Sequence, residues 1–253
     1  VVMSDDLAEA SWHIDGDGHS ISGMYIKCNE EKVGLISRIT GSGYIRDLTI
    51  KDSYVTSSQA PQSYKGYIGV FVGQSSRTSF TNCAGENNIA ITNNCYLTGG
   101  IVGWSYGGDS FNVVHVSGSI QGSGALAGIT GRANGATFKN CWNEMDIDNA
   151  NTDRPIRHSG GLAAMADSSE FYNCANLGYL ALTREVQNVR ALAFCTDVVK
   201  ARAILGVAAL HGHVLAVHTG KGRHIVPASI LFDAGDIACG VAILYPGRHQ
   251  PVR

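Results

Sequence analysis

The chain has 253 residues, a formal net charge of -2, only 16% charged residues and 31 glycines. This length allows one large or two small domains with a buried core. The near-balanced charge and the lack of a Lys/Arg cluster argue against a nucleic-acid-binding surface. The sequence contains no run of about 18 apolar residues, so no membrane span is predicted. The start lacks the cationic and apolar segments of a secretory signal, so we expect a mature product, a fragment or an unsecreted chain.

A repeated unit fills the chain up to Leu180. Short apolar segments begin at Val33, Tyr67, Gly99, Gly124 and Gly160. Each is followed by a polar stretch rich in Gly and Ser, and then by one large apolar anchor: Ile45, Phe80, Phe111, Phe138 and Phe171. Two residues after the anchors stand Asp47, Asn82, Val113, Asn140 and Asn173, and nine residues after them stand Tyr54, Ile89, Ile120, Ile147 and Leu180.

The repeated unit is typical of strands rather than helices. Its short apolar runs, such as 67–72, 110–116 and 136–141, are bounded by Gly, Ser, Asn and Asp turns. One unit cannot bury both faces of its apolar side chains, whereas units stacked about 4.8 Å apart align like residues into ladders. The sequence therefore predicts an all-β chain whose residues 1–180 form a parallel β-solenoid of about five irregular coils, with the anchors and their partners nine residues later in its core.

The opening WHIDGDGHSISG from Trp12 and the units TGGIVGWSYGG and SGALAGITGRANGATFKNC resemble the GLUG repeat of bacterial adhesins and of non-catalytic regions of surface-anchored peptidases. The resemblance covers about residues 12–180. It implies a right-handed parallel β-helix displayed on the bacterial surface or secreted, which serves in adhesion, in ligand presentation or as a spacer, with a glycan or a host surface protein as partner. It supplies no catalytic residues, and we expect the chain to be part of a longer polypeptide.

Aromatic residues near predicted turns are the candidate ligand-binding residues. Trp104, Tyr106 and Trp142 fall at or beside turns, where exposed rings could stack on sugar rings. The alternative is that these rings cap the core over glycine-rich corners. No catalytic residue, metal ligand or cofactor-binding residue is predicted.

Several polar positions favour structural roles over chemistry. The cysteines of FTNC, FKNC and FYNC (Cys83, Cys141, Cys174) occupy one repeat position and are predicted to be buried in a ladder, without the spacing of a metal site. The asparagines before them predict a corner ladder that bonds the turn backbone. The DGDG at 15–18 lacks the distal Glu of a calcium loop and is interpreted as a turn.

A polysaccharide-degrading β-helix is the alternative function. Glycoside hydrolysis needs two carboxylates facing one cleft, and Asp146 and Asp148 form a close acidic pair inside a unit, on one face of a strand. The Asp residues in successive coils and the basic partners of pectin-degrading enzymes are missing. We therefore expect no enzyme activity from these residues.

Residues 181–253 have a different composition. After Leu180 the balance of charges becomes positive, Asn188 is the last asparagine, and no repeat is present. The segment 189–210 is predicted to form a weak apolar helix, and the histidines at 211, 213, 218 and 224 lack a strict metal-binding spacing. The segment is interpreted as either a small cap of the solenoid or a stretch read out of frame or joined from another gene.

Overall fold

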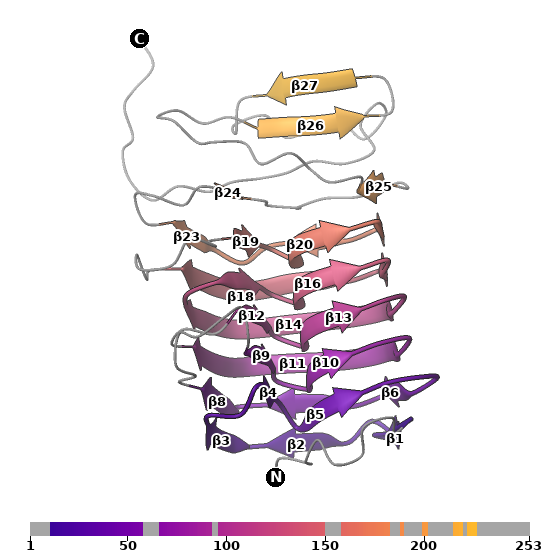
Figure 1. Ribbon diagram of the computed structural model, residues 1–253, viewed down its shortest axis with the longest axis vertical. Coiled ribbons are helices and arrows are strands. Elements are labelled where there is room, and N and C mark those ends of the chain that lie inside the picture. The colour runs from indigo at the N-terminus through magenta and orange to yellow at the C-terminus, as the bar shows by residue number, and fades with distance from the viewer. Residues whose placement is uncertain are drawn as a thin grey trace.

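The computed structural model describes residues 11–57, 66–92, 96–149, 158–182, 188–189, 199–201, 215–219 and 222–226. Those up to residue 182 form a β-solenoid of parallel strands whose coils stack in chain order along the long axis (Figure 1). The predicted all-β solenoid is therefore confirmed. Within these residues there is no helix of the length and apolarity that a membrane crossing requires.

Each coil runs through a six-stranded sheet, then a five-stranded sheet, then a long 14-stranded sheet. The six-stranded sheet contains β4 (Lys32–Val33), β9 (Tyr67–Gly69), β12 (Leu97–Gly99), β15 (Ala125–Ala127), β19 (His158–Gly160) and β24 (Asn188–Val189). The five-stranded sheet contains β5 (Ile36–Ile39), β10 (Val72–Ser75), β13 (Val102–Tyr106), β16 (Thr130–Asn134) and β20 (Ala163–Asp167).

The long sheet forms the remaining side of the coils. It contains β1 (His13–Asp15), β2 (Ser20–Ser22), β3 (Tyr25–Cys28), β6 (Tyr44–Arg46), β7 (Thr49–Lys51), β8 (Tyr54–Ser57), β11 (Ser79–Thr92), β14 (Ser110–Gly122), β17 (Thr137–Lys139), β18 (Trp142–Asn149), β21 (Ser169–Tyr172), β22 (Ala175–Asn176), β23 (Leu180–Leu182) and β25 (Val199–Ala201). All pairings among its strands are parallel except that of β25 with β21.

Little of the segment after Leu182 is described. β24 pairs in parallel with β19, and β26 (Leu215–Thr219) forms an antiparallel pair with β27 (Gly222–Val226). The predicted helix over 189–210 is not seen in its described residues, which lie in β24 and β25. The rest of that segment and the histidines at 211 and 213 lie outside the described residues.

The anchors form the central ladder of the core. Ile45 pairs with Phe80, Phe80 with Phe111, Phe111 with Phe138, and Phe138 with Phe171. The four phenylalanine rings stack in parallel with centroid distances of 4.9, 4.6 and 4.5 Å. All five side chains are at most 1% exposed, which confirms this part of the predicted core.

Of the partners nine residues after the anchors, Ile120 and Ile147 are buried in the core. Ile120 pairs with Ile147 in register, but its partner in the preceding coil is Ala90 rather than Ile89. Ala90 is fully buried, whereas Ile89 is 42% exposed beside Tyr54 on the outer surface. The prediction is wrong for Tyr54 and Ile89, because the register of β11 against β14 shifts between Gly85 and Asn88, so the earlier coils hold one more residue before the buried position.

A corner ladder follows the anchors. Its residues all have left-handed backbone: Asp47 (φ 51°), Asn82 (φ 50°), Val113 (φ 55°), Asn140 (φ 52°) and Asn173 (φ 48°). Asp and Asn tolerate this conformation better than other non-glycine residues. The predicted ladder is confirmed, although its described side-chain bonds join neighbouring side chains rather than the turn backbone.

Glycine is needed where two sheets approach each other. A Cβ atom at Gly99, at the end of β12, would overlap the carbonyl oxygens of Val102 and Ile129. Gly69 occupies the same position one coil earlier and is equally crowded by Val72 and Ile101. The glycines of the repeat therefore permit the sharp turn from the six-stranded to the five-stranded sheet.

Candidate functional site

A row of aromatic rings runs from β9 of the six-stranded sheet to β13 of the five-stranded sheet. The rings of Tyr67 and Trp104 meet edge to face at 4.9 Å, and those of Trp104 and Tyr106 at 5.0 Å. Tyr67 is buried, Trp104 is half-buried and Tyr106 is 53% exposed. The row therefore extends from the interior to an open ring at the surface.

Trp104 lies within β13 rather than at a turn, so this part of the prediction is wrong. Gly103 and Ser105 are buried on either side of Trp104, as strand alternation requires. The glycine-rich composition of GWSYGG suggested a turn, but Gly103 instead permits close approach to the backbone of Tyr67 and Ile68.

Polar groups flank the aromatic row on the following coils. Trp104 pairs with Arg132 and Tyr106 with Asn134 in the parallel register of β13 and β16. The Arg132 guanidinium donates to the Asp167 carboxylate at 2.8 and 3.1 Å and, through Nε, to Asn134 Oδ1 at 3.1 Å. An exposed ring beside fixed donors and acceptors is the arrangement that sugar hydroxyls require.

Trp142 lies apart from this row, on the long sheet at the start of β18. Its ring stacks on that of His115 at 4.7 Å, and His115 Nε2 lies 3.3 Å from Glu144 Oε2. The structure therefore does not bring the three predicted aromatic residues together. Trp104 and Tyr106 share one surface, and Trp142 belongs to another.

Asp146 and Asp148 pair with Ser119 and Gln121 along β14, two residues apart on one strand. They share one face of β18, as predicted. Asp146 Oδ1 accepts a hydrogen bond from the backbone N–H of Tyr179 at 3.1 Å. One oxygen of this carboxylate thus holds the next coil in place.

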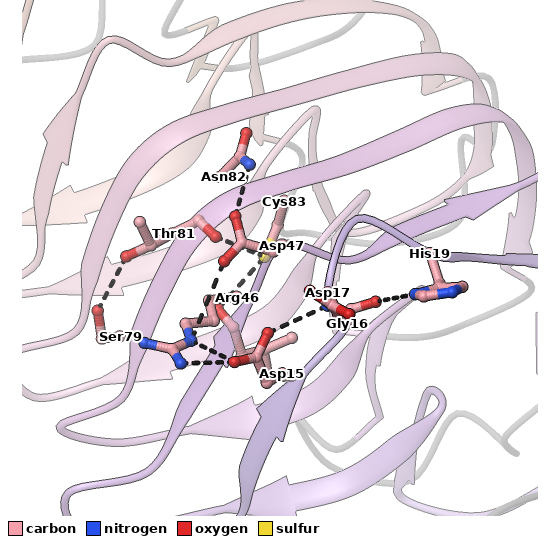
Figure 2. Close-up of polar contacts among 11 residues, drawn as sticks. Asp15, Gly16, Asp17, His19, Arg46, Asp47, Ser79, Thr81, Asn82 and Cys83 are labelled. Atoms are coloured by element: carbon pink, nitrogen blue, oxygen red, sulfur yellow. Dashed lines mark hydrogen bonds and ion pairs between the residues drawn. The ribbon is translucent and has the colours of Figure 1, made fainter.

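The DGDG segment forms a turn at the first corner (Figure 2). The Asp15 carboxylate accepts hydrogen bonds from Arg46 Nε at 2.9 Å and from the N–H of Asp17 at 3.1 Å. Arg46 and then the N–H of Asp17 hold the pKa of Asp15 below its ordinary value.

Within the residues that the structure describes, no three His, Cys, Asp or Glu residues gather in a geometry that could hold a metal ion.

The cysteine position is buried, as predicted. Cys83, Cys141 and Cys174 are 1%, 1% and 4% exposed, and their thiols donate to backbone carbonyls. Val114 occupies the same position between Cys83 and Cys141. Burial raises the pKa of the Cys83 thiol to about 12, so this thiol is unreactive as a nucleophile near neutral pH.

Sequence reasoning missed two buried polar positions. The Asp109 carboxyl is 1% exposed and accepts hydrogen bonds from the Ser75 hydroxyl and from the N–H of Thr78. Asn143 is fully buried and donates to Asn176 Oδ1 at 2.6 Å. Asp109 lies in a Gly- and Ser-rich stretch, and Asn143 follows Trp142 at the start of β18. Only the register of the coils places both side chains in the interior.

No family model matches the chain, and neither the curated proteins nor the solved structures include a match.

Proposed function

We propose that the chain is a non-enzymatic repeat region of a bacterial surface protein, akin to GLUG-repeat proteins, that binds a glycan and so serves adhesion. The observation that carries this proposal is the exposed ring of Tyr106 at the end of the row Tyr67, Trp104 and Tyr106. A ring held by its neighbours loses little conformational entropy when a sugar stacks on it.

The polar neighbours favour a neutral, hydroxyl-rich ligand. Arg132 and Asp167 neutralise each other, and Asn134 adds an amide beside Tyr106. Such a set offers donors and acceptors without a net charge, so a neutral polysaccharide fits better than an acidic one.

The test is affinity electrophoresis of the purified chain through gels that contain neutral or acidic polysaccharides. For a polysaccharide that retards the chain, Tyr106→Ala should lower the affinity by about tenfold, because one stacking contact contributes about 1.5 kcal/mol. Tyr106→Phe should keep the retardation. Tyr25→Ala is the matched control, because Tyr25 is also exposed (65%) but lies in β3 of the long sheet. Equal retardation of Tyr106→Ala and the parent chain would refute the proposal.

A polysaccharide-degrading enzyme is the second candidate, favoured by the acidic face of β18. Glu144, Asp146 and Asp148 alternate along this strand beside the Trp142–His115 stack. Release of reducing ends from the same polysaccharides, abolished by Asp146→Asn or Asp148→Asn, would support this candidate over adhesion. Retardation without release of reducing ends would favour adhesion.

A further inference from the structure

Two of the buried cysteines stand directly above one another in neighbouring coils. Phe138 pairs with Phe171, and Cys141 and Cys174 each follow three residues later. The N–H of Ala175 donates to the carbonyl of Cys141 at 2.9 Å, which ties the two coils together at this position. Parallel neighbours about 4.8 Å apart fall within the range of Cα separations that disulfides span.

The third cysteine of the column has no such neighbour. Cys83 lies between Leu48 of the preceding coil, whose carbonyl accepts from the N–H of Ala84, and Val114 of the following coil. The repeat therefore provides one adjacent thiol pair and, at the same repeat position, an isolated thiol in an equally buried setting.

We infer that Cys141 and Cys174 are a modification site, which a small-molecule disulfide oxidises to a disulfide bond between neighbouring coils. This inference stands independently of the proposed glycan binding. One cysteine loses its proton and attacks the oxidant RSSR, which forms a mixed disulfide and releases one RSH. The second cysteine, also deprotonated, displaces the remaining R–S group, so two protein thiols and RSSR become one protein disulfide and two RSH.

The bond would fasten the coil that contains β17 and β18 to the coil that contains β21 and β22. Burial raises the pKa of the Cys141 thiol, and a hydrogen bond between the two thiols raises it further. Few thiolates are therefore present near neutral pH, so the oxidation is slow and accelerates as the pH rises.

The test uses the full folded chain incubated with glutathione disulfide at mildly alkaline pH. Remaining thiols are alkylated in denaturant before tryptic digestion and mass spectrometry. Trypsin places Cys141 in the peptide 140–157 and Cys174 in the peptide 158–184, each with a single cysteine. We expect these two peptides to be recovered joined, with the mass of the pair lowered by two hydrogens, and to separate after reduction.

Cys83 and a valine variant provide the controls. Cys83 should be recovered alkylated rather than joined to Cys141 or Cys174. The variant Cys174→Val introduces valine, which already occupies this repeat position at Val114. In this variant, Cys141 should also be recovered alkylated. Recovery of both Cys141 and Cys174 alkylated after the chain has been oxidised at other cysteines would overturn the inference. Linkage of either residue to a different cysteine in the folded chain would overturn it as well.

Discussion

Asn173 donates a hydrogen bond from its side-chain amide to Oδ1 of Asn140, one coil earlier, at 2.7 Å, and both residues have positive φ. Asn82 donates in the same way to Asp47 at 2.6 Å. Val113 stands between these two pairs with φ 55° and is 37% exposed. A β-branched residue is strained in this conformation, and it cannot continue the ladder.

Val113→Asn should therefore stabilise the solenoid. Relief of the left-handed strain, together with bonds to Asn82 and Asn140, should raise the free energy of unfolding by about 1 kcal/mol. The measurement is urea unfolding followed by circular dichroism. The reciprocal variant Asn140→Val should lose a similar amount, and a Val113→Asn chain less stable than its parent would show that this corner does not accept the ladder.

Phe111→Ala should be among the most damaging single substitutions. The ring stacks between Phe80 at 4.9 Å and Phe138 at 4.6 Å and is 1% exposed, so its removal leaves a cavity in the middle of the ladder. We expect a loss of about 3 to 5 kcal/mol in urea unfolding. A loss below about 1 kcal/mol would mean that the side chain does not lie in the core.

The register shift in β11 separates two isoleucines that are equivalent in the sequence repeat. Ile89→Ala should change the free energy of unfolding by less than about 0.5 kcal/mol, because the side chain is 42% exposed. Ile120→Ala should cost about 2 to 5 kcal/mol, because Ile120 is fully buried. Similar losses from both variants would contradict the shifted register.

Asp109 should make the stability of the fold depend on pH. Burial raises the pKa of its carboxyl above the ordinary value of 3.8, so the folded state holds the proton more tightly than the unfolded state does. The free energy of unfolding should then fall as the pH rises from about 4 through the folded pKa. In Asp109→Asn, which keeps an acceptor for the N–H of Thr78, this contribution is absent.

The measurement for Asp109 is urea unfolding of the parent chain and of Asp109→Asn across the mildly acidic to neutral range. The variant should gain stability relative to the parent as the pH rises. A difference that stays constant with pH, or that shrinks as the pH rises, would contradict the burial of an ionisable carboxyl at this corner.

The spacing of the repeat was sufficient to predict the solenoid, the phenylalanine ladder and the cysteine column. These features depend on side chains that stack on their equivalents in the next coil, so a constant offset from the anchor reveals them. The constant offset no longer predicts the buried position where a bulge adds a residue, as between Gly85 and Asn88. No characteristic residue type marks this bulge in a stretch rich in Gly and Asn.

The candidate site was only partly predictable. The aromatic character of Trp104 and Tyr106 is visible in the sequence, and the structure places their rings in contact. The contact of Tyr67 with Trp104 depends on packing between two sheets. The separation of Trp142 from this row also depends on the sheet in which β18 lies. A linear sequence does not show which sheets face each other.

Limited proteolysis with trypsin, read by intact mass, tests the stacking of the coils most directly. A protease binds its substrate as an extended, unpaired strand, so backbone that is paired on both sides resists cleavage even where the side chain is accessible. Arg46 in β6 and Lys139 in β17 have exposed side chains, and both strands pair with a neighbour on each side. We predict that the bonds after Arg46 and Lys139 stay intact when other sites of the chain have been cut. Early cleavage after either residue would contradict a solenoid of stacked parallel coils.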